Sequence, residues 1–254
     1  MNDHPAATFK PELRPLYVQI QGLITKRIAD GAWKPGDLLP TEHELAAEYG
    51  VSQGTVRKAL IALEGEKLIV RRQGVGTYVA RHARDTVLFR FFRIVTPEGA
   101  RLSPKSRLIA QEIRPATAEE ARQLALAAGA PLHAVTRVRT LRDAPSIYEF
   151  VVVPAAIIPV LDLPATEEMS EEMYVIYQER HGILITRVQE RLQAIAAGPE
   201  EAQALGVPEG LPLLEIVRVA FDVSGRPVEL RISRCDTREN RYSADIVDTD
   251  GAQA

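Results

Sequence analysis

The sequence of 254 residues predicts an α+β protein with two domains, residues 1–82 and 83–254. Three observations support this fold class. Apolar residues at helical spacing recur three times before residue 66, and a glycine-tipped pair of β-prone segments follows up to residue 79. Alternating strand patterns then fill most of the remaining chain. The first part therefore has the layout of a winged helix-turn-helix, and the second part that of an antiparallel sheet.

The first predicted helix spans residues 15–30, with Pro15 at its start and Gly31 as its stop signal. Pro35 and Gly36 then form a turn. The apolar positions at helical spacing are Leu16, Ile20, Leu23, Ile24, Ile28 and Trp33. We expect Trp33 and Tyr17 to lie in the core of the first domain.

Two further helices follow. Thr41 is expected to cap the second helix in a capping box with Glu44, and Gly50 ends that helix. Ser52 caps the third helix, which runs to about Glu66. Its inward positions are Val56, Ala59, Leu60 and Leu63, and its first turns expose Gln53, Gly54, Thr55, Arg57 and Lys58. An outward polar and basic first turn is typical of a helix that enters the major groove of DNA.

A predicted hairpin, the wing, joins residues 68–70 to residues 77–79 through a loop that contains Gly74 and Gly76. Two glycines allow a tight turn and a close approach to a phosphate or a minor groove. A plain structural hairpin is the alternative, but the order of helices and wing favours the DNA-binding interpretation.

The charge distribution agrees with that interpretation. The net charge is −3, yet residues 1–82 hold eleven Lys/Arg against nine Asp/Glu, whereas the remainder holds twenty against twenty-five. Six basic residues stand against two acidic ones within residues 51–82. A local basic surface is what phosphate contact requires, although a solvated charged face would have the same composition.

At these positions the sequence resembles the GntR family of bacterial transcription factors. The resemblance covers residues 13–80 and includes Pro35-Gly36-Asp37, Leu39-Pro40-Thr41-Glu42 and the Gly-x-Gly-Thr wing. It implies contacts with double-stranded operator DNA from Thr41, Glu42, Ser52, Gln53, Thr55, Arg57, Lys58, Arg72, Gln73 and Gly76. Family members usually carry Arg at Gln53, and the amide present here suits adenine readout. Thr41 replaces a frequent Ser and keeps the capping hydroxyl.

The second domain contains an internal repeat. Three sequence elements recur 81 positions further on: Glu119-Glu120-Ala121 as Glu200-Glu201-Ala202, Pro131-Leu132 as Pro212-Leu213, and Arg137-Val138 as Arg218-Val219. Each copy predicts a short helix, a strand, a hairpin turn and a second strand. The constant offset favours duplication over chance similarity, and two such units can share one antiparallel sheet with a cleft at their junction.

Arg137 and Arg139 are two positions apart on one predicted strand, so both side chains leave the same face. Adjacent guanidinium groups repel each other unless an anion lies between them. That anion is either a ligand or a carboxylate such as Glu149 on the next strand. Structural pairing is the commoner explanation, but an attached DNA-binding domain favours a ligand site.

Residues 87–248 are similar to the ligand-sensing UTRA domain of the HutC subfamily of GntR regulators. The shared pattern is Arg-x-Arg, Pro145, Glu149, Pro154, Tyr174, His181-Gly182 and Glu229. The resemblance implies a fold like that of chorismate lyase with a buried pocket. It also implies ligand contacts from Arg137, Arg139, Glu149, Glu172, Tyr174, Glu229, Cys235 and Tyr242.

Two departures from the UTRA pattern affect the expected ligand. Glu172 stands where relatives that sense sugar phosphates have a Ser, and the run from Cys235 to Tyr242 differs from the usual sequence. A carboxylate beside a phosphate is unfavourable. We therefore expect a small organic acid rather than a sugar phosphate. Taken as an isolated residue, Cys235 is expected to be half-buried in a strand.

Several other classes of protein fit poorly. A single cysteine excludes an intrachain disulfide framework, and one cysteine with five scattered histidines indicates no metal site. No apolar run is long enough to cross a membrane, and residues 1–10 lack a signal-peptide pattern. We expect no cofactor and no catalysis, since no catalytic signature or cofactor loop is present. The expected protein is a cytoplasmic, homodimeric repressor that a small anionic effector releases from its operator. The alternatives are an enzyme on the lyase-like fold and an architectural DNA-binding protein.

Overall fold

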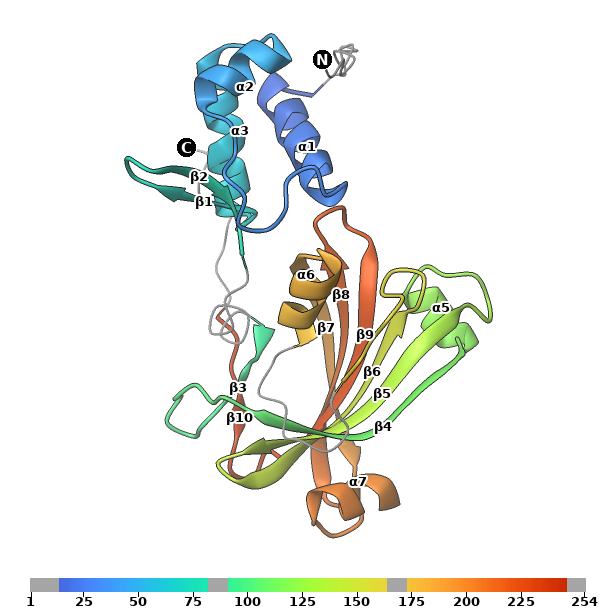
Figure 1. Cartoon of the computed structure of the whole chain (residues 1–254). Helices are drawn as coiled ribbons and strands as arrows, with labels where there is room; N and C mark the ends of the chain where they lie inside the picture. The colour runs from blue at the N-terminus through green and yellow to red at the C-terminus, as the bar shows by residue number, and fades with distance from the viewer. Residues whose placement is uncertain (1–13, 82–90, 164–172, 246–254) are drawn as a thin grey trace. The chain divides into compact units, whose positions relative to one another are not determined.

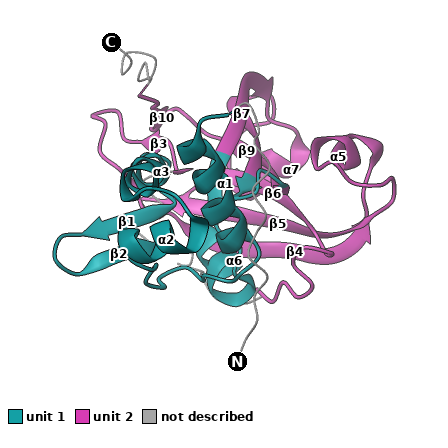
Figure 2. Cartoon of the chain, turned by 90° about the horizontal axis from the view of Figure 1, so that it is seen from above, with its two compact units in different colours: residues 1–82, 174–187, 221–226 teal, residues 83–173, 188–220, 227–254 magenta. Residues whose placement is uncertain are grey.

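The computed structural model describes residues 14–81, 91–163 and 173–245 (Figure 1). The chain divides into two compact units. The first comprises Met1–His82, Tyr174–Arg187 and Phe221–Arg226, and the second comprises Ala83–Met173, Val188–Ala220 and Pro227–Ala254 (Figure 2). None of the helices within the described ranges combines the length and apolar character that a membrane crossing requires.

The first unit begins with three helices, α1 Leu16–Ala29, α2 Glu42–Tyr49 and α3 Gln53–Gly65. The predicted caps are confirmed. The Thr41 side chain and Glu44 form the capping box of α2, Gly50 ends it with a left-handed backbone (φ +65°), and the Ser52 side chain caps α3. Local hydrogen bonding thus sets both ends of the turn between α2 and α3.

The core of this unit contains the expected faces of α1 and α3. Ile20, Ile24 and Ile28 are buried, whereas Leu16 at the first position of α1 is exposed. The four predicted inward positions of α3 are all buried: Val56, Ala59, Leu60 and Leu63. Trp33 belongs to the same cluster, and Tyr17 is partly buried against it. The guanidinium of Arg27 lies 3.8 Å from the centre of the Trp33 ring.

The wing is the hairpin of β1 Ile69–Arg72 and β2 Gly76–Val79, with Arg72 opposite Gly76. Arg71 and Arg72, which the sequence predicted to lie in the loop, both belong to β1. Gly76 has a φ of +140°, and a Cβ built there would lie 2.6 Å from Cδ1 of Leu38. Backbone conformation and packing against Leu38 therefore explain this glycine without any ligand.

The second unit is built on a six-stranded sheet with the order β4-β5-β6-β9-β8-β7 (Figure 1). The strands are β4 Lys105–Pro115, β5 Pro131–Leu141, β6 Ala144–Pro154, β7 Ile185–Ala196, β8 Pro212–Asp222 and β9 Pro227–Cys235. The short strands β3 Ile94–Val95 and β10 Arg241–Tyr242 pair separately. The helices of this unit are α5 Ala118–Gln123 and α7 Pro199–Leu205, whereas α6 Met173–His181 belongs, from Tyr174 on, to the first unit.

The predicted repeat appears as two copies of the same element order. Helix α5 with β5 and β6 matches helix α7 with β8 and β9, and the two sets lie side by side because β6 pairs with β9. The strands before each helix, β4 and β7, extend the repeat beyond the part found in the sequence. The capping box of Thr117 with Glu120 and the start of α7 at Pro199 are as predicted. The duplication therefore supplies both halves of the sheet, with their junction at β6 and β9.

Substitution of Leu63 by Ala should destabilise the first unit. Leu63 is fully buried in α3, so the truncation leaves a cavity and should cost about 2–5 kcal/mol of unfolding free energy. Ile61→Ala on the same helix is the control, because Ile61 is 55% exposed and its truncation should change stability by about 0.5 kcal/mol or less. Urea unfolding followed by the fluorescence of Trp33, the single tryptophan, measures both. Equal effects of the two changes would contradict the packing described.

Candidate functional site

The start of α3 presents the residues expected to read DNA. Arg57 and Lys58 are exposed, and Gln53 is exposed with its amide nitrogen 3.0 Å from Nδ1 of His43. Oγ of Ser52 accepts a hydrogen bond from the Thr55 backbone N–H at 3.1 Å and lies 2.9 Å from Oγ1 of Thr55. Both hydroxyls are therefore engaged in the helix cap.

One carboxylate joins all three parts of the helix-turn-helix and wing. Oε2 of Glu42, the first residue of α2, accepts from Nε of Arg57 at 2.9 Å and lies 2.8 Å from Nη2 of the same guanidinium. Its Oε1 accepts from Nη2 of Arg71 on β1 at 3.1 Å. The hydrogen bond to Glu42 raises the pKa of Arg57. Glu42 therefore contacts two arginines of the basic surface directly.

The wing brings three further candidates to the same unit. The Arg72 guanidinium lies 5.0 Å from the centre of the Tyr78 ring, and Gln73 is exposed in the turn. Gly76, Thr41 and Glu42 line one surface hollow between the wing and the start of α2. The ten candidate DNA-binding residues thus lie on α2, α3 and the wing of one compact unit.

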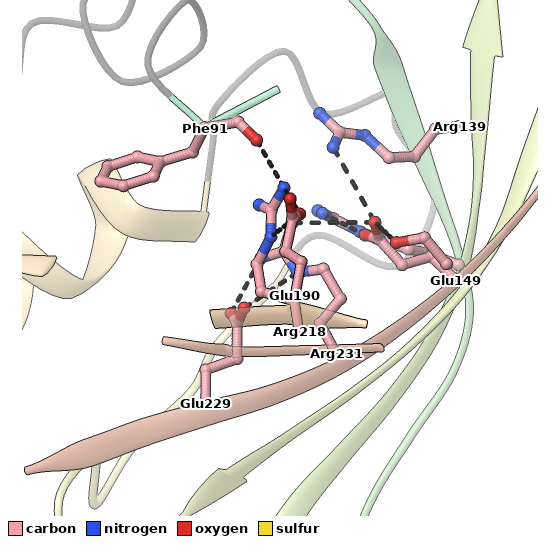
Figure 3. A network of polar contacts seen from close by, with 9 residues as sticks. Phe91, Arg139, Glu149, Glu190, Arg218, Glu229 and Arg231 are labelled. Carbon is pink, nitrogen blue, oxygen red and sulfur yellow. Dashed lines mark hydrogen bonds and ion pairs between the residues drawn. The ribbon is translucent and has the colours of Figure 1, made fainter. Parts of the chain in front are cut away.

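In the second unit, Glu149 is the centre of a buried network on β5, β6 and β9 (Figure 3). Its carboxylate accepts hydrogen bonds from Nε of Arg137 at 2.6 Å and from Oγ of Ser233 at 2.8 Å. Its Oε1 also lies 3.9 Å from Nη1 of Arg139 and 3.7 Å from Nη1 of Arg231. Glu149 therefore contacts both Arg137 and Arg139, which is the structural pairing that the sequence left open beside a ligand.

Two more ion pairs adjoin this centre. Arg231 donates to both oxygens of Glu229, at 2.9 and 2.8 Å. Arg218 donates to Glu190 through Nε at 2.8 Å and to the carbonyl oxygen of Phe91 through Nη2 at 2.5 Å.

Tyr242 also contacts the Glu190 carboxylate that pairs with Arg218, because its hydroxyl donates to Oε2 of Glu190 at 2.5 Å. Burial and this contact raise the pKa of Tyr242 to about 12. The aromatic segment before β3 is also involved, since the Arg139 guanidinium lies 4.8 Å from the centre of the Phe92 ring.

The network is densely charged. Its described members include the guanidinium groups of Arg137, Arg139, Arg218 and Arg231 and the carboxylates of Glu149, Glu190 and Glu229. Burial raises the pKa of Glu149, but Arg137, Arg231 and Arg139 more than offset that effect and hold the pKa well below its usual range. Nη1 of Arg137 is buried and has no hydrogen-bond partner within the described part of the chain.

Four members of the network were not predicted as site residues from the sequence: Arg231, Ser233, Arg218 and Glu190. Two signals were present. Arg231 and Ser233 follow Glu229 at strand spacing, which places all three on one face of β9, and Arg218 is the repeat counterpart of Arg137. Glu190 on the edge strand β7 gave no signal, because its role depends on which strand lies beside it.

Cys235 lies in different surroundings from the other candidates. It is 1% exposed and packs with Ile94, Leu141 and Ile147. The expectation of half-burial was wrong, because β10 and β3 contribute an apolar cluster over the end of β9. Burial raises the pKa of the thiol.

The last two ligand candidates are Tyr174 and Glu172. Tyr174 is buried on α6 within the first unit, and its ring centre lies 5.9 Å from that of Tyr177. Glu172 lies outside the described residues. Within the described ranges, no group of three His, Cys, Asp or Glu is positioned to hold a metal ion.

Comparison with known families matches both units. Residues 16–79 match the model described as bacterial regulatory proteins, gntR family, and residues 99–242 match the UTRA domain. The chain belongs to the GntR family, HutC subfamily. This GntR/UTRA regulator binds DNA through its helix-turn-helix and an effector through its UTRA domain, and it is not an enzyme.

Relatives of this regulator match over nearly its full length. It is 31% identical to the HTH-type transcriptional repressor NagR of Bacillus subtilis (strain 168), over 85% of this chain and 88% of that protein. It is 30% identical to the mannosyl-D-glycerate transport/metabolism system repressor MngR of Escherichia coli (strain K12), over 91% of this chain and 95% of that protein.

A solved structure supports the fold of the second unit. The ligand-binding domain of a GntR-family regulator from Bordetella bronchiseptica matches with a TM-score of 0.58 and 27% identity, covering 66% of this chain and all of that one.

Glu149→Gln should destabilise the second unit by about 3–5 kcal/mol, because three buried arginines lose the charge they share. Added sulfate should restore part of this loss by supplying an anion. Urea unfolding followed by circular dichroism measures both effects. The control is Glu112→Gln on β4, an exposed glutamate 3.8 Å from Arg114, which should leave stability nearly unchanged. A Glu149→Gln protein as stable as the wild type would show that the arginines do not depend on this carboxylate.

Proposed function

We propose that this GntR/UTRA regulator is a homodimeric repressor that a small anionic effector releases from operator DNA. Residues 1–82 bind DNA, and residues 83–254 sense the effector and form the dimer. The ranges of the two family matches, 16–79 and 99–242, support this division. The relatives NagR and MngR are both described as repressors, which supports the direction of control. The protein acts in the cytoplasm, where its operator lies.

The observation that carries the anionic effector is Nη1 of Arg137, which is buried and has no hydrogen-bond partner within the described part of the chain. A buried guanidinium nitrogen requires an acceptor, and a charged acceptor gives the stronger hydrogen bond. An organic acid is favoured over a sugar phosphate because Glu172 stands where relatives that sense sugar phosphates have a Ser.

On the DNA side, Gln53, Thr55, Arg57 and Lys58 are proposed to enter the major groove. Arg72, Gln73 and Gly76 of the wing contact the phosphate backbone or the minor groove. Ser52 and Thr41 hold the helices through their caps, so their contribution is mainly to position these groups. A single helix reads only a few base pairs, and a homodimer that binds two half-sites multiplies the discrimination.

Release follows from linkage between the two sites. The arginines of the network also hold the segment at Phe91 and Phe92, the first described residues after 82–90. An effector that draws Arg139 or Arg218 toward itself competes with these contacts. Coupling of this kind typically changes affinity at the other site by about 1–3 kcal/mol.

Arg57→Ala should lower operator affinity about tenfold, because a bidentate arginine contact with a base is lost. The operator is obtained by selection of duplexes from a random pool with the wild-type protein, and affinity is measured by fluorescence anisotropy. Arg27→Ala is the control, since Arg27 pairs with Glu48 and is not on the start of α3. Unchanged binding by the Arg57 variant would remove this residue from the proposed contacts.

Arg137→Lys should retain operator affinity within about twofold but raise the effector concentration for half release at least about tenfold, because lysine lacks the planar fork of arginine. The effector is taken from a thermal-shift screen of small organic acids and sugar phosphates on the wild-type protein. Arg114→Lys, which alters an arginine paired with Glu120, is the matched control. Normal release of the Arg137 variant would overturn the anion site.

A further inference from the structure

An acidic residue lies within the basic surface that faces DNA, and its contacts explain why. Glu42 is the first residue of α2, and its side chain retains 26% of its accessible surface. Each of its oxygens is assigned to a different arginine, Oε2 to Arg57 on α3 and Oε1 to Arg71 on the wing. The carboxylate thus joins the recognition helix, the helix before it and the hairpin.

A direct contact between Glu42 and the DNA backbone is unfavourable, because carboxylate and phosphate repel each other. The negative charge at this position also reduces the attraction of the surface for any duplex, whatever its sequence. Any gain in DNA binding from Glu42 must therefore come through Arg57 and Arg71, the arginines that it contacts. The N-terminus of α2 favours the anion in this place.

The way in which Glu42 holds Arg57 leaves the reading edge of that guanidinium accessible. Oε2 engages Nε and Nη2, so it contacts the side of the planar group. Nη1 and the outer hydrogen of Nη2 point away from this contact, and they form the pair of donors that matches O6 and N7 of guanine. The Arg57 side chain is 59% exposed, so without Glu42 it would sample many rotamers.

We propose that Glu42 is a specificity-determining positioning residue, which orients Arg57 for base readout and weakens binding to unrelated DNA. The inference rests on the proposed contact between Arg57 and a base. The negative charge of Glu42 weakens binding to every duplex. Only operator binding regains affinity, because Arg57 is fixed in advance for its base.

The test compares full-length wild-type protein with Glu42→Gln on two duplexes, the selected operator and an unrelated sequence of equal length, over a series of salt concentrations. We expect the variant to bind the unrelated duplex severalfold more tightly and the ratio of the two affinities to fall about tenfold. Glu48→Gln is the control, because it removes the same charge from the same helix at a residue that pairs with Arg27. It should leave the ratio unchanged.

Two additional measurements separate positioning from other roles. In an Arg57→Ala background, Glu42→Gln should not lower the ratio of operator affinity to unrelated-duplex affinity any further, since the carboxylate acts through this arginine. A further loss would mean that Glu42 reads a base itself and would overturn the proposal. A parallel fall of both affinities together with the melting temperature would show a purely structural role and would also overturn it. If the wild-type protein showed no preference for any duplex, the proposed function itself would fail.

Discussion

The second unit depends on a carboxylate that is almost inaccessible to solvent and is shared by three arginines. Glu149 receives Arg137 and Ser233 as hydrogen-bond donors and lies within 4 Å of guanidinium nitrogens of Arg139 and Arg231. Four buried charged side chains on the central strands, Glu149 and the three arginines, are tolerated because opposite charges lie next to one another. The strands that carry them must keep their register, because a shift of one residue would direct the charges to the opposite face of the sheet.

The network also explains why the site requires both halves of the repeat. Arg137 and Glu149 come from β5 and β6, whereas Arg231 and Ser233 come from β9 of the other copy. The contact between β6 and β9 is therefore the point at which the two copies form one site. Neither half contains the complete arrangement.

Much of the fold could be predicted because its signals are local. Capping boxes at Thr41 and Thr117, the left-handed Gly50 and the buried face of α3 each depend on residues within a few positions of one another. The repeat was visible as a constant offset between short motifs. The pairing of Arg137 with Glu149 followed from one hairpin, since these residues are directly opposite each other.

The rest depended on neighbours that are distant in sequence. Glu190 meets Arg218 only because β7 lies at the edge beside β8, and Arg231 meets Glu149 only because the two copies adjoin. Glu42 was predicted as a DNA contact from the family pattern, but its hydrogen bonds to Arg57 and Arg71 depend on how α2, α3 and the wing pack. Likewise, the reason for a glycine at position 76 includes Leu38, which no local pattern indicates.

The two copies of the repeat differ in how their matching arginines, Arg137 and Arg218, are paired. Arg137 is paired with a glutamate on the strand after it, whereas its counterpart Arg218 is paired with a glutamate on the strand before it in the chain and also donates to a main-chain carbonyl. If the two copies of the repeat were identical and related by twofold symmetry, a site between them would offer an asymmetric molecule two poses of equal energy. Because the two copies here pair their arginines differently, a metabolite bound at the proposed effector site would have one preferred orientation.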